Sequence, residues 1–183
     1  MIVAIIVIVI VVILVAWFVS IYNGIVRKDN RCDNAWQTID AQLQRRNDLI
    51  PNLVETVKGY AAHESGTLSA VTQARAAVMS ATTREEKMAA SNVLSDTLKS
   101  LFAVSEAYPE LKANANFQQL QSELSDTENK ISYARMSFND CVLEYNNAIE
   151  TFPGNVVAGS KFQKRQGFEV QSEAARQVPQ VKF

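Results

Sequence analysis

The sequence predicts an all-α protein in which an N-terminal transmembrane helix is followed by a long, antiparallel four-helix bundle. Residues 1–26 carry no charged side chain and form one apolar run. After this run, apolar residues recur at spacings of three and four, the period of an amphipathic helix. Six glycines and four prolines among 183 residues leave long stretches without a helix breaker. Because no segment after residue 26 alternates with a period of two, β-structure is not predicted.

The first segment is expected to be a retained membrane anchor rather than a cleaved signal peptide. The stretch from Ile2 to Tyr22 is apolar except for Ser20, and its 21 residues would form a helix about 31 Å long, enough to cross a hydrocarbon core of roughly 30 Å. A signal peptide has a basic start, a shorter apolar run and a small-residue cleavage site. The N-terminal segment lacks all three features, so we predict that residues 1–26 stay in the membrane.

Five residues at or just after the C-terminal end of the apolar run are expected at the membrane interface. Two are amphipathic aromatic residues and three are basic: Trp17, Tyr22, Arg27, Lys28 and Arg31. The flanking Lys and Arg all follow the apolar run, so the positive-inside rule predicts that the bundle lies on the cytoplasmic side of the membrane. The apolar run contains no Gly-x-x-x-Gly, and association between copies is therefore expected to depend on the bundle and the C-terminal segment.

The first helix of the bundle is expected over residues 36–60, and the transmembrane helix can run straight into it. Apolar residues recur at three and four along it: Trp36, Ile39, Leu43, Ile50, Leu53, Val57 and Tyr60. Arg46 occupies one position of this apolar seam, and Pro51 lies inside the pattern. Because proline cannot donate to the helix ladder, we expect a kink or break near residues 48–51.

Two shorter helices are expected next. The first covers residues 64–81, with Leu68, Val71 and Val78 facing inward. The second is opened by a capping box, in which Thr83 stands three residues before Glu86, and it stops near Tyr108-Pro109.

The longest bundle helix is expected over residues 116–151 and ends at Phe152-Pro153-Gly154. Its apolar and small residues alternate strictly at three and four, and they predict the core seam Phe117, Leu120, Leu124, Thr127, Ile131, Ala134, Phe138, Cys141, Tyr145, Ala148 and Phe152. Glu128 falls outside this seam, so its replacement by Ala is expected to change stability little. Together these helices make residues 27–154 a bundle of about four helices joined by short turns.

Residues 155–183 form a basic C-terminal strap. Lys161, Lys164 and Arg165 alternate there with Phe162 and Phe168. Such a segment can rest on an anionic leaflet, or it can pack along the bundle with its phenylalanines in grooves. We favour packing, because the seam of the longest helix would otherwise end in open solvent.

The charge distribution argues against nucleic acid as a partner. Residues 152–183 carry five basic and two acidic side chains, a net of +3, whereas residues 83–151 carry six basic and eleven acidic ones, a net of −5. A nucleic-acid-binding domain usually has a basic face of its own. The basic excess of this chain is instead confined to the membrane flank and the tail.

The sequence predicts no catalytic residues, no metal site and no cofactor. His63 is the one histidine, and a di-metal carboxylate bundle would need two Glu-x-x-His pairs on facing helices. No glycine-rich phosphate loop and no serine elbow is present. We therefore expect that the protein is not an enzyme, and that His63 lies in a turn or at the surface.

One charged stretch is a candidate interaction surface. It consists of Arg45, Arg46, Asp48, Asn52 and Glu55, which lie around the expected kink. The alternative, which we favour, is that these residues make ordinary ion pairs on the helix surface.

Seven stretches, in order over nearly the whole chain, carry a family resemblance: residues 36–60, WQTIDAQLQRRNDLIPNLVETVKGY, then 108–114, 119–121, 127–131, 134–135, 152–154 and the ending VPQVKF. Together they resemble the bacterial LemA family, whose signature is similar to residues 36–60. The chain has Phe138-Asn139 where the family usually has Tyr-Asn, and Ala41-Gln42 where it has Val-Gln. The resemblance implies a single-pass membrane protein with a helical bundle and no settled activity. Magnetosome-associated relatives point, by analogy, to membrane organisation.

Two functions follow as hypotheses. The first is a non-enzymatic scaffold that self-associates as a homo-oligomer at the bacterial inner membrane and organises or shapes that membrane. The second is an adaptor that binds another membrane protein through its bundle, at the surface formed by residues 45–57. The particle size of the detergent-purified protein distinguishes them, because a scaffold forms a large assembly and an adaptor can be a monomer.

Overall fold

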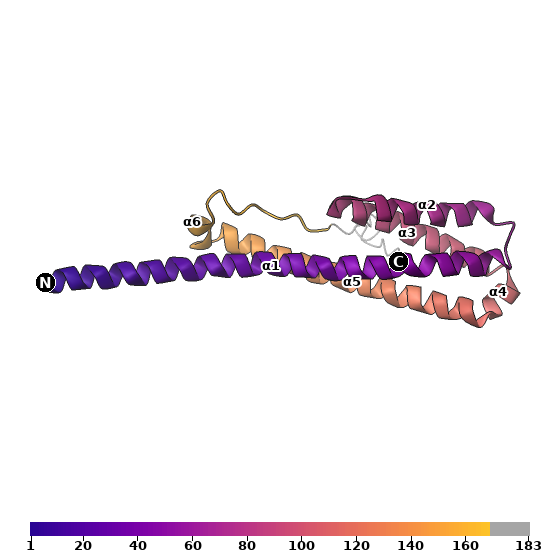
Figure 1. The fold of residues 1–183 in the computed structure, drawn as a ribbon, viewed down its shortest axis with the longest axis horizontal. Helices are drawn as coiled ribbons and strands as arrows, with labels where there is room; N and C mark the ends of the chain where they lie inside the picture. The colour runs from indigo at the N-terminus through magenta and orange to yellow at the C-terminus, as the bar shows by residue number, and fades with distance from the viewer. Residues whose placement is uncertain (169–183) are drawn as a thin grey trace, which may run out of the picture.

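The computed structural model describes residues 1–168 of the chain, and this part is helical with no strand (Figure 1). Its helices are α1 (Ile2–Lys58), α2 (Ser65–Ser80), α3 (Arg84–Ser105), α4 (Pro109–Ala113), α5 (Ala115–Glu150) and α6 (Gly154–Ala158). The predicted all-α fold is confirmed. The short helices α4 and α6 were not predicted, because five residues are too few to show a helical period.

Helix α1 joins the apolar N-terminal segment to the bundle without interruption. Its 57 residues form a rod of about 86 Å. Every large apolar side chain from Ile2 to Val19 is between 47% and 76% exposed, whereas Ile25 is buried. By length and composition, α1 is the one helix of the described residues that could cross a membrane. The predicted anchor and the first helix of the bundle are therefore parts of the same helix.

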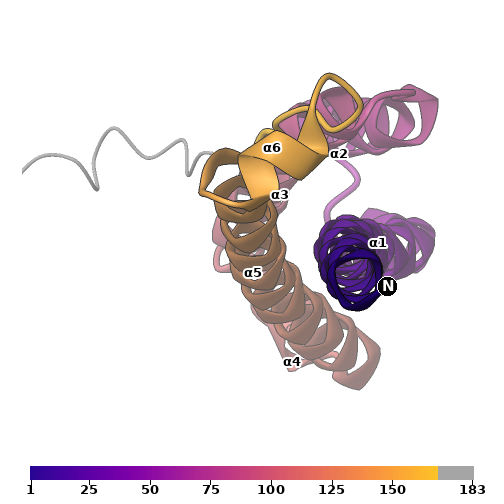
Figure 2. The ribbon, with the colours of Figure 1, turned by 90° about the vertical axis from the view of Figure 1, so that its left-hand side faces the viewer.

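Helices α1, α2, α3 and α5 run alternately up and down (Figure 1). Because α2 has 16 residues and α3 has 22, they accompany only the half of the bundle farther from the N-terminus. Along the nearer half, α1 and α5 are covered by α6 and by the following part of the predicted strap, residues 159–168, for which the word strap is used from here on (Figures 1 and 2). The predicted four-helix bundle is thus complete at its distal end, and the strap takes the place of two helices at the membrane end.

The core consists of two apolar clusters that are separated by a polar layer. The distal cluster contains Ile50, Leu94 and Leu124, and the membrane-side cluster contains Leu43, Met88 and Ile131. On each helix a buried polar residue lies between its two cluster residues. These polar residues are Arg46 on α1, Ser91 on α3 and Thr127 on α5. Each of the three helices therefore changes from apolar to polar and back at the same level of the bundle.

The core face of α5 follows the predicted seam at Tyr145 and, apart from the partly buried Leu120, at every position up to Phe138. Beyond it, Val142 and Ile149 are buried, whereas the predicted positions Cys141 and Ala148 are only partly buried and Phe152 is 77% exposed. A straight α-helix has 3.6 residues per turn and drifts about 20° per heptad from a strict 3.5-residue repeat. Over 36 residues this drift moves the core face to the next position, which corrects the last part of the predicted seam.

Pro51 does not break α1, which continues to Lys58. Proline has no N–H, so the carbonyl of Asn47, four residues earlier, has no donor from Pro51. The Nε of Arg75 on α2 donates to this carbonyl at 2.9 Å. Asn47 is buried, and without Arg75 its carbonyl would lack a partner in the core. Of the predicted kink or break near residues 48–51, the break is therefore wrong, since the helix continues and a tertiary contact supplies a donor to the free carbonyl, and the kink stays a prediction.

Replacing Arg75 with Ala is expected to destabilise the bundle by about 1–3 kcal/mol, the usual cost of an unpaired buried carbonyl. The cost should fall by about 1 kcal/mol in a Pro51→Ala background, because an alanine at this position supplies the missing N–H. Urea unfolding of the four proteins of this cycle, in detergent, measures both values. Equal effects of Arg75→Ala in the two backgrounds would contradict this role.

Candidate functional site

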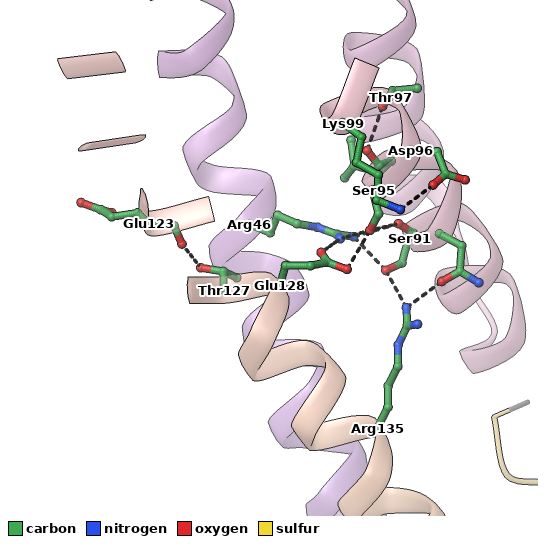
Figure 3. Close-up of polar contacts among 12 residues, drawn as sticks. Arg46, Ser91, Ser95, Asp96, Thr97, Lys99, Glu123, Thr127, Glu128 and Arg135 are labelled. Atoms are coloured by element: carbon green, nitrogen blue, oxygen red, sulfur yellow. Dashed lines mark hydrogen bonds and ion pairs between the residues drawn. The ribbon is translucent and has the colours of Figure 1, made fainter. Parts of the chain in front are cut away.

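The polar layer is organised around a fully buried arginine, Arg46, which is 0% exposed (Figure 3). Its Nη1 donates to Glu128 Oε2 and to Ser95 Oγ, both at 2.8 Å. Its Nη2 donates to the hydroxyl of Ser91 at 2.8 Å and to the carbonyl of Ser91 at 3.2 Å. The guanidinium thus links α1 to α3 and α5 at one point.

A second guanidinium, that of Arg135, reaches the same place from α5 (Figure 3). Its Nη2 donates to Ser91 Oγ at 3.2 Å and to Asn92 Oδ1 at 2.9 Å. Burial lowers the pKa of both arginines from its ordinary value, with the carboxylate of Glu128 opposing this shift. The Nε atoms of Arg46 and Arg135 are buried and have no partner among the described residues.

The hydrogen bonds of this layer join three helices. An arginine stays charged at any physiological pH and does not exchange protons there, so neither guanidinium can serve as a general acid or base. The serine hydroxyls bond to guanidinium, carboxylate and carbonyl groups, and none of their hydrogen bonds among the described residues involves an imidazole or an amine. A buried polar layer of this kind favours one axial register of the helices, since sliding by a turn would strand its charges in the apolar clusters.

Four of the five residues of the predicted interaction surface are exposed, and their role in binding stays a prediction. Arg45, Asp48, Asn52 and Glu55 are exposed, and their spacing of three, four and three places them in one stripe along α1. Arg46 does not belong to this stripe, because it points into the core. Its place on the apolar seam was the signal of this burial, since a seam position faces inward whatever residue occupies it.

The predicted membrane-interface residues lie where the bundle begins. Trp17 is 48% exposed, and Tyr22 packs edge-on against Phe162 of the strap, with ring centroids 5.5 Å apart. Lys28 and Arg31 both pair with Glu144 of α5, at 3.3 and 3.1 Å. Arg27 is exposed. Their position relative to a bilayer stays a prediction.

Two asparagines of α5 hold the strap by its main chain. Asn146 donates to the carbonyl of Arg165 and accepts from its N–H, at 2.9 and 3.0 Å. Asn139 makes the same pair of bonds to Phe168, at 2.9 and 2.8 Å. Seven residues of helix and three of extended chain both span about 10 Å, so the two pairs fall into register. At Gly167, a side chain would come within 2.9 Å of the Asn139 amide oxygen, which favours glycine there.

The side chains of the strap complete this docking. Arg165 donates to Asp29 and to Asp33 on α1, both at 2.7 Å, and Arg84 of α3 also reaches Asp33 at 2.9 Å. The bonds from Arg165 are the largest cause that lowers the pKa of Asp33, and the two aspartates raise the pKa of Arg165. Phe168 stacks on Phe138 with ring centroids 4.9 Å apart. The predicted packing of the strap along the bundle is confirmed up to residue 168, and the rest of the predicted strap, 169–183, lies outside the described residues.

Two grooves lie beside α5. The larger one, of about 680 Å³, lies between α3 and α5 and is lined by Leu98, Phe102 and Glu128 among others. The smaller one, of about 370 Å³, lies between α1 and α5 and is lined by Ala35, Tyr133 and Ala134 among others. The described residues contain no group of His, Cys, Asp and Glu side chains that could hold a metal ion. His63 is exposed in the turn between α1 and α2.

Comparison with known proteins gives two findings. The sequence pattern of the LemA family matches residues 35–183. The chain is also similar to Protein LemA of Metamycoplasma hominis, with 28% identity over 142 residues. That match covers 77% of this chain and 65% of the relative, so the chain spans less than two thirds of the relative's length.

Proposed function

The chain belongs to the LemA family, and from this premise we propose that it is a non-enzymatic, membrane-anchored scaffold that self-associates at the bacterial inner membrane. The bundle lies on the cytoplasmic side in this proposal, because the basic residues that follow the apolar run favour that side. The assembly organises the membrane in which its anchors are embedded. Two features of the molecule support self-association, and they are the apolar outer face of α5 and the continuity of α1.

The observation that carries the proposal is a stripe of exposed apolar side chains on α5. Tyr133, Met136 and Leu143 are 74%, 63% and 60% exposed. Their spacing of three and seven fits a helix-pairing seam whose remaining position is the exposed Asp140, and this seam lies on the side of α5 facing away from the core residues Ile131 and Phe138. The inner face of α5 packs in the core of the bundle. The exposed apolar side chains on its outer face are therefore available to pack against a helix of another molecule.

The anchor determines how copies can use this stripe. All copies enter the bilayer in the same direction, so the symmetry axis of an assembly is normal to the membrane. Because α1 is one helix from Ile2 to Lys58, each bundle stands at a similar angle and presents α5 at the same height. Neighbouring copies therefore meet through parallel helices at matching levels, as closed rings and dimers require.

The double variant Met136→Lys/Leu143→Lys is expected to shift the full-length protein from oligomer to monomer. Placing lysine charges in an apolar interface costs several kcal/mol, and each 1.4 kcal/mol weakens association tenfold. Mass photometry in detergent, over a range of protein concentrations, measures the change. The matched control is Met79→Lys/Val93→Lys, which adds the same charge at exposed apolar residues of α2 and α3.

The control variant should assemble as the unmodified protein does. If the unmodified protein is itself a monomer at micromolar concentration, the scaffold proposal fails. If both double variants dissociate equally, the outer face of α5 is not the interface.

The second candidate function is an adaptor for another membrane protein. It is favoured by the exposed polar stripe of α1, which consists of Arg45, Asp48, Asn52 and Glu55. This stripe lies beyond the membrane flank and carries both signs of charge, as the rim of a protein–protein interface often does. An adaptor predicts a monomer in the same measurement, together with an unchanged size of the α5 double variant.

A further inference from the structure

The corner between α5 and α6 lies level with the end of the apolar anchor segment. Val157 and Ala158 of α6 belong to the same buried cluster as Ile25 of α1. Just after α6, Phe162 packs on Tyr22, and Lys161 contacts the Tyr22 hydroxyl and its ring. Figures 1 and 2 show α6 at the end of the bundle nearer the N-terminus. The height of this corner is thus set by packing against the helix turn where the anchor leaves the membrane.

This corner exposes large apolar side chains. Phe152 and Val156 are 77% and 71% exposed, which is more than any large apolar residue of the anchor from Ile5 to Val19. The aromatic residues of the adjoining strap do not share this exposure, because Phe162 and Phe168 pack on the bundle. The apolar groups available to lipid at this level are therefore those of the corner, and the strap phenylalanines serve the core.

The surroundings of the corner carry basic groups at the same level. Arg27, Lys161 and Lys164 are exposed, and Lys164 pairs with Glu150. Apolar side chains beside basic ones are the composition of a segment that lies in the interfacial region of a bilayer with anionic lipids. Trp17 and Tyr22 belong to the same zone, since aromatic residues of membrane anchors settle at headgroup level.

We propose that the α5–α6 corner is a second membrane contact, which inserts Phe152 and Val156 into the interface of the leaflet through which the anchor emerges. The continuous α1 sets the angle between the bundle and the transmembrane segment, but the anchor alone does not determine the direction in which α1 tilts in the bilayer. The corner adds a second point to one side of α1, so that the tilt has one preferred direction. The contact does not require self-association, because a single copy carries both points.

Site-directed spin labelling of the full-length chain in vesicles tests the contact. The vesicles contain phosphatidylcholine and phosphatidylglycerol, and the background is Cys32→Ala/Cys141→Ala. Labels are placed by Phe152→Cys or Val156→Cys, and the control is Val93→Cys on α3. Val93 is 56% exposed and lies two residues from Ser91, which contacts Arg46; this level is about 36 Å beyond Tyr22.

The relative effect of the two relaxing agents is expected to be opposite at the corner and at residue 93. Lipid-soluble oxygen should relax the labels at 152 and 156 more than an aqueous nickel chelate does, and the reverse should hold at 93. A label at 152 that is relaxed mainly by the nickel chelate would lie in water, which overturns the proposal. A label relaxed poorly by both agents would be covered by protein, such as a second copy, and this also overturns it.

A second measurement needs no cysteine background. In Trp17→Phe/Phe152→Trp, fluorescence quenching by brominated lipids should exceed that of Trp17→Phe alone, whose remaining tryptophan is Trp36. Equal quenching of the two proteins would contradict insertion of the corner.

Discussion

Ile131→Asp is expected to unfold the bundle of the full-length protein at 25 °C. Ile131 is 0% exposed and lies in the membrane-side cluster between α1 and α5. The change removes a buried aliphatic side chain and places a carboxyl group where no partner is available, at a combined cost of about 5 kcal/mol or more. Domains of this size are usually stable by roughly 5–15 kcal/mol, so the change removes most of that stability.

The matched control is Ser132→Asp, which adds the same charge at the next residue on the exposed face of α5. Thermal unfolding followed by circular dichroism in detergent should show no cooperative transition for Ile131→Asp and a nearly unchanged one for Ser132→Asp. Similar curves for the two variants would mean that the core face of α5 has been assigned wrongly.

Glu128→Ala is expected to destabilise the bundle by about 2–3 kcal/mol. This reverses the expectation from the helical pattern, which placed Glu128 on the solvated face. Its carboxylate is 43% exposed but pairs at 2.8 Å with Arg46, whose side chain is 1% exposed. Removing one partner of a buried ion pair costs roughly 3–5 kcal/mol, and the value is smaller here because Ser91 and Ser95 still accept from the guanidinium.

Two further variants show whether the buried charge is the cause. Arg46→Met removes the charge together with its need for a partner, and it should cost less than Glu128→Ala. Asp126→Ala breaks an exposed pair with Lys130 on the same helix and should cost less than about 1 kcal/mol. Urea unfolding measures all three. If Glu128→Ala behaves like Asp126→Ala, Arg46 does not depend on Glu128.

The four long helices α1, α2, α3 and α5 could be predicted from the sequence because each carries its own local signal. The capping box of Thr83 and Glu86 opens α3 as expected, and the long helix predicted over residues 116–151 matches α5 to within a residue at each end. Features that depend on a partner helix could not be predicted. The helical pattern says that Pro51 leaves a carbonyl free, but only the fold brings Arg75 to it.

The same distinction applies to the candidate sites. The seam position of Arg46 indicated that it is buried. Its partner Glu128 falls outside the seam and was therefore predicted to face water, but its long side chain reaches inward from the edge of the helix face to Arg46. Asn139 and Asn146 are ordinary polar residues on a helix, and their partner is an extended segment without any period. Their spacing of seven residues along the helix matches the length of three residues of extended chain, so it can be recognised as a binding pattern only once the extended segment is known.

Because α1 is one continuous helix, a tilt of its N-terminal segment also moves the far end of the bundle. A transmembrane helix changes its tilt when the bilayer becomes thicker or thinner, and a change of about 10° is within the ordinary range of such helices. The 36 residues of α1 beyond Tyr22 extend about 54 Å, so that change would carry the far end of the bundle sideways by about 9 Å. With the apolar segment in a bilayer, as predicted, a change in bilayer thickness would therefore displace the end of the bundle farthest from the lipid.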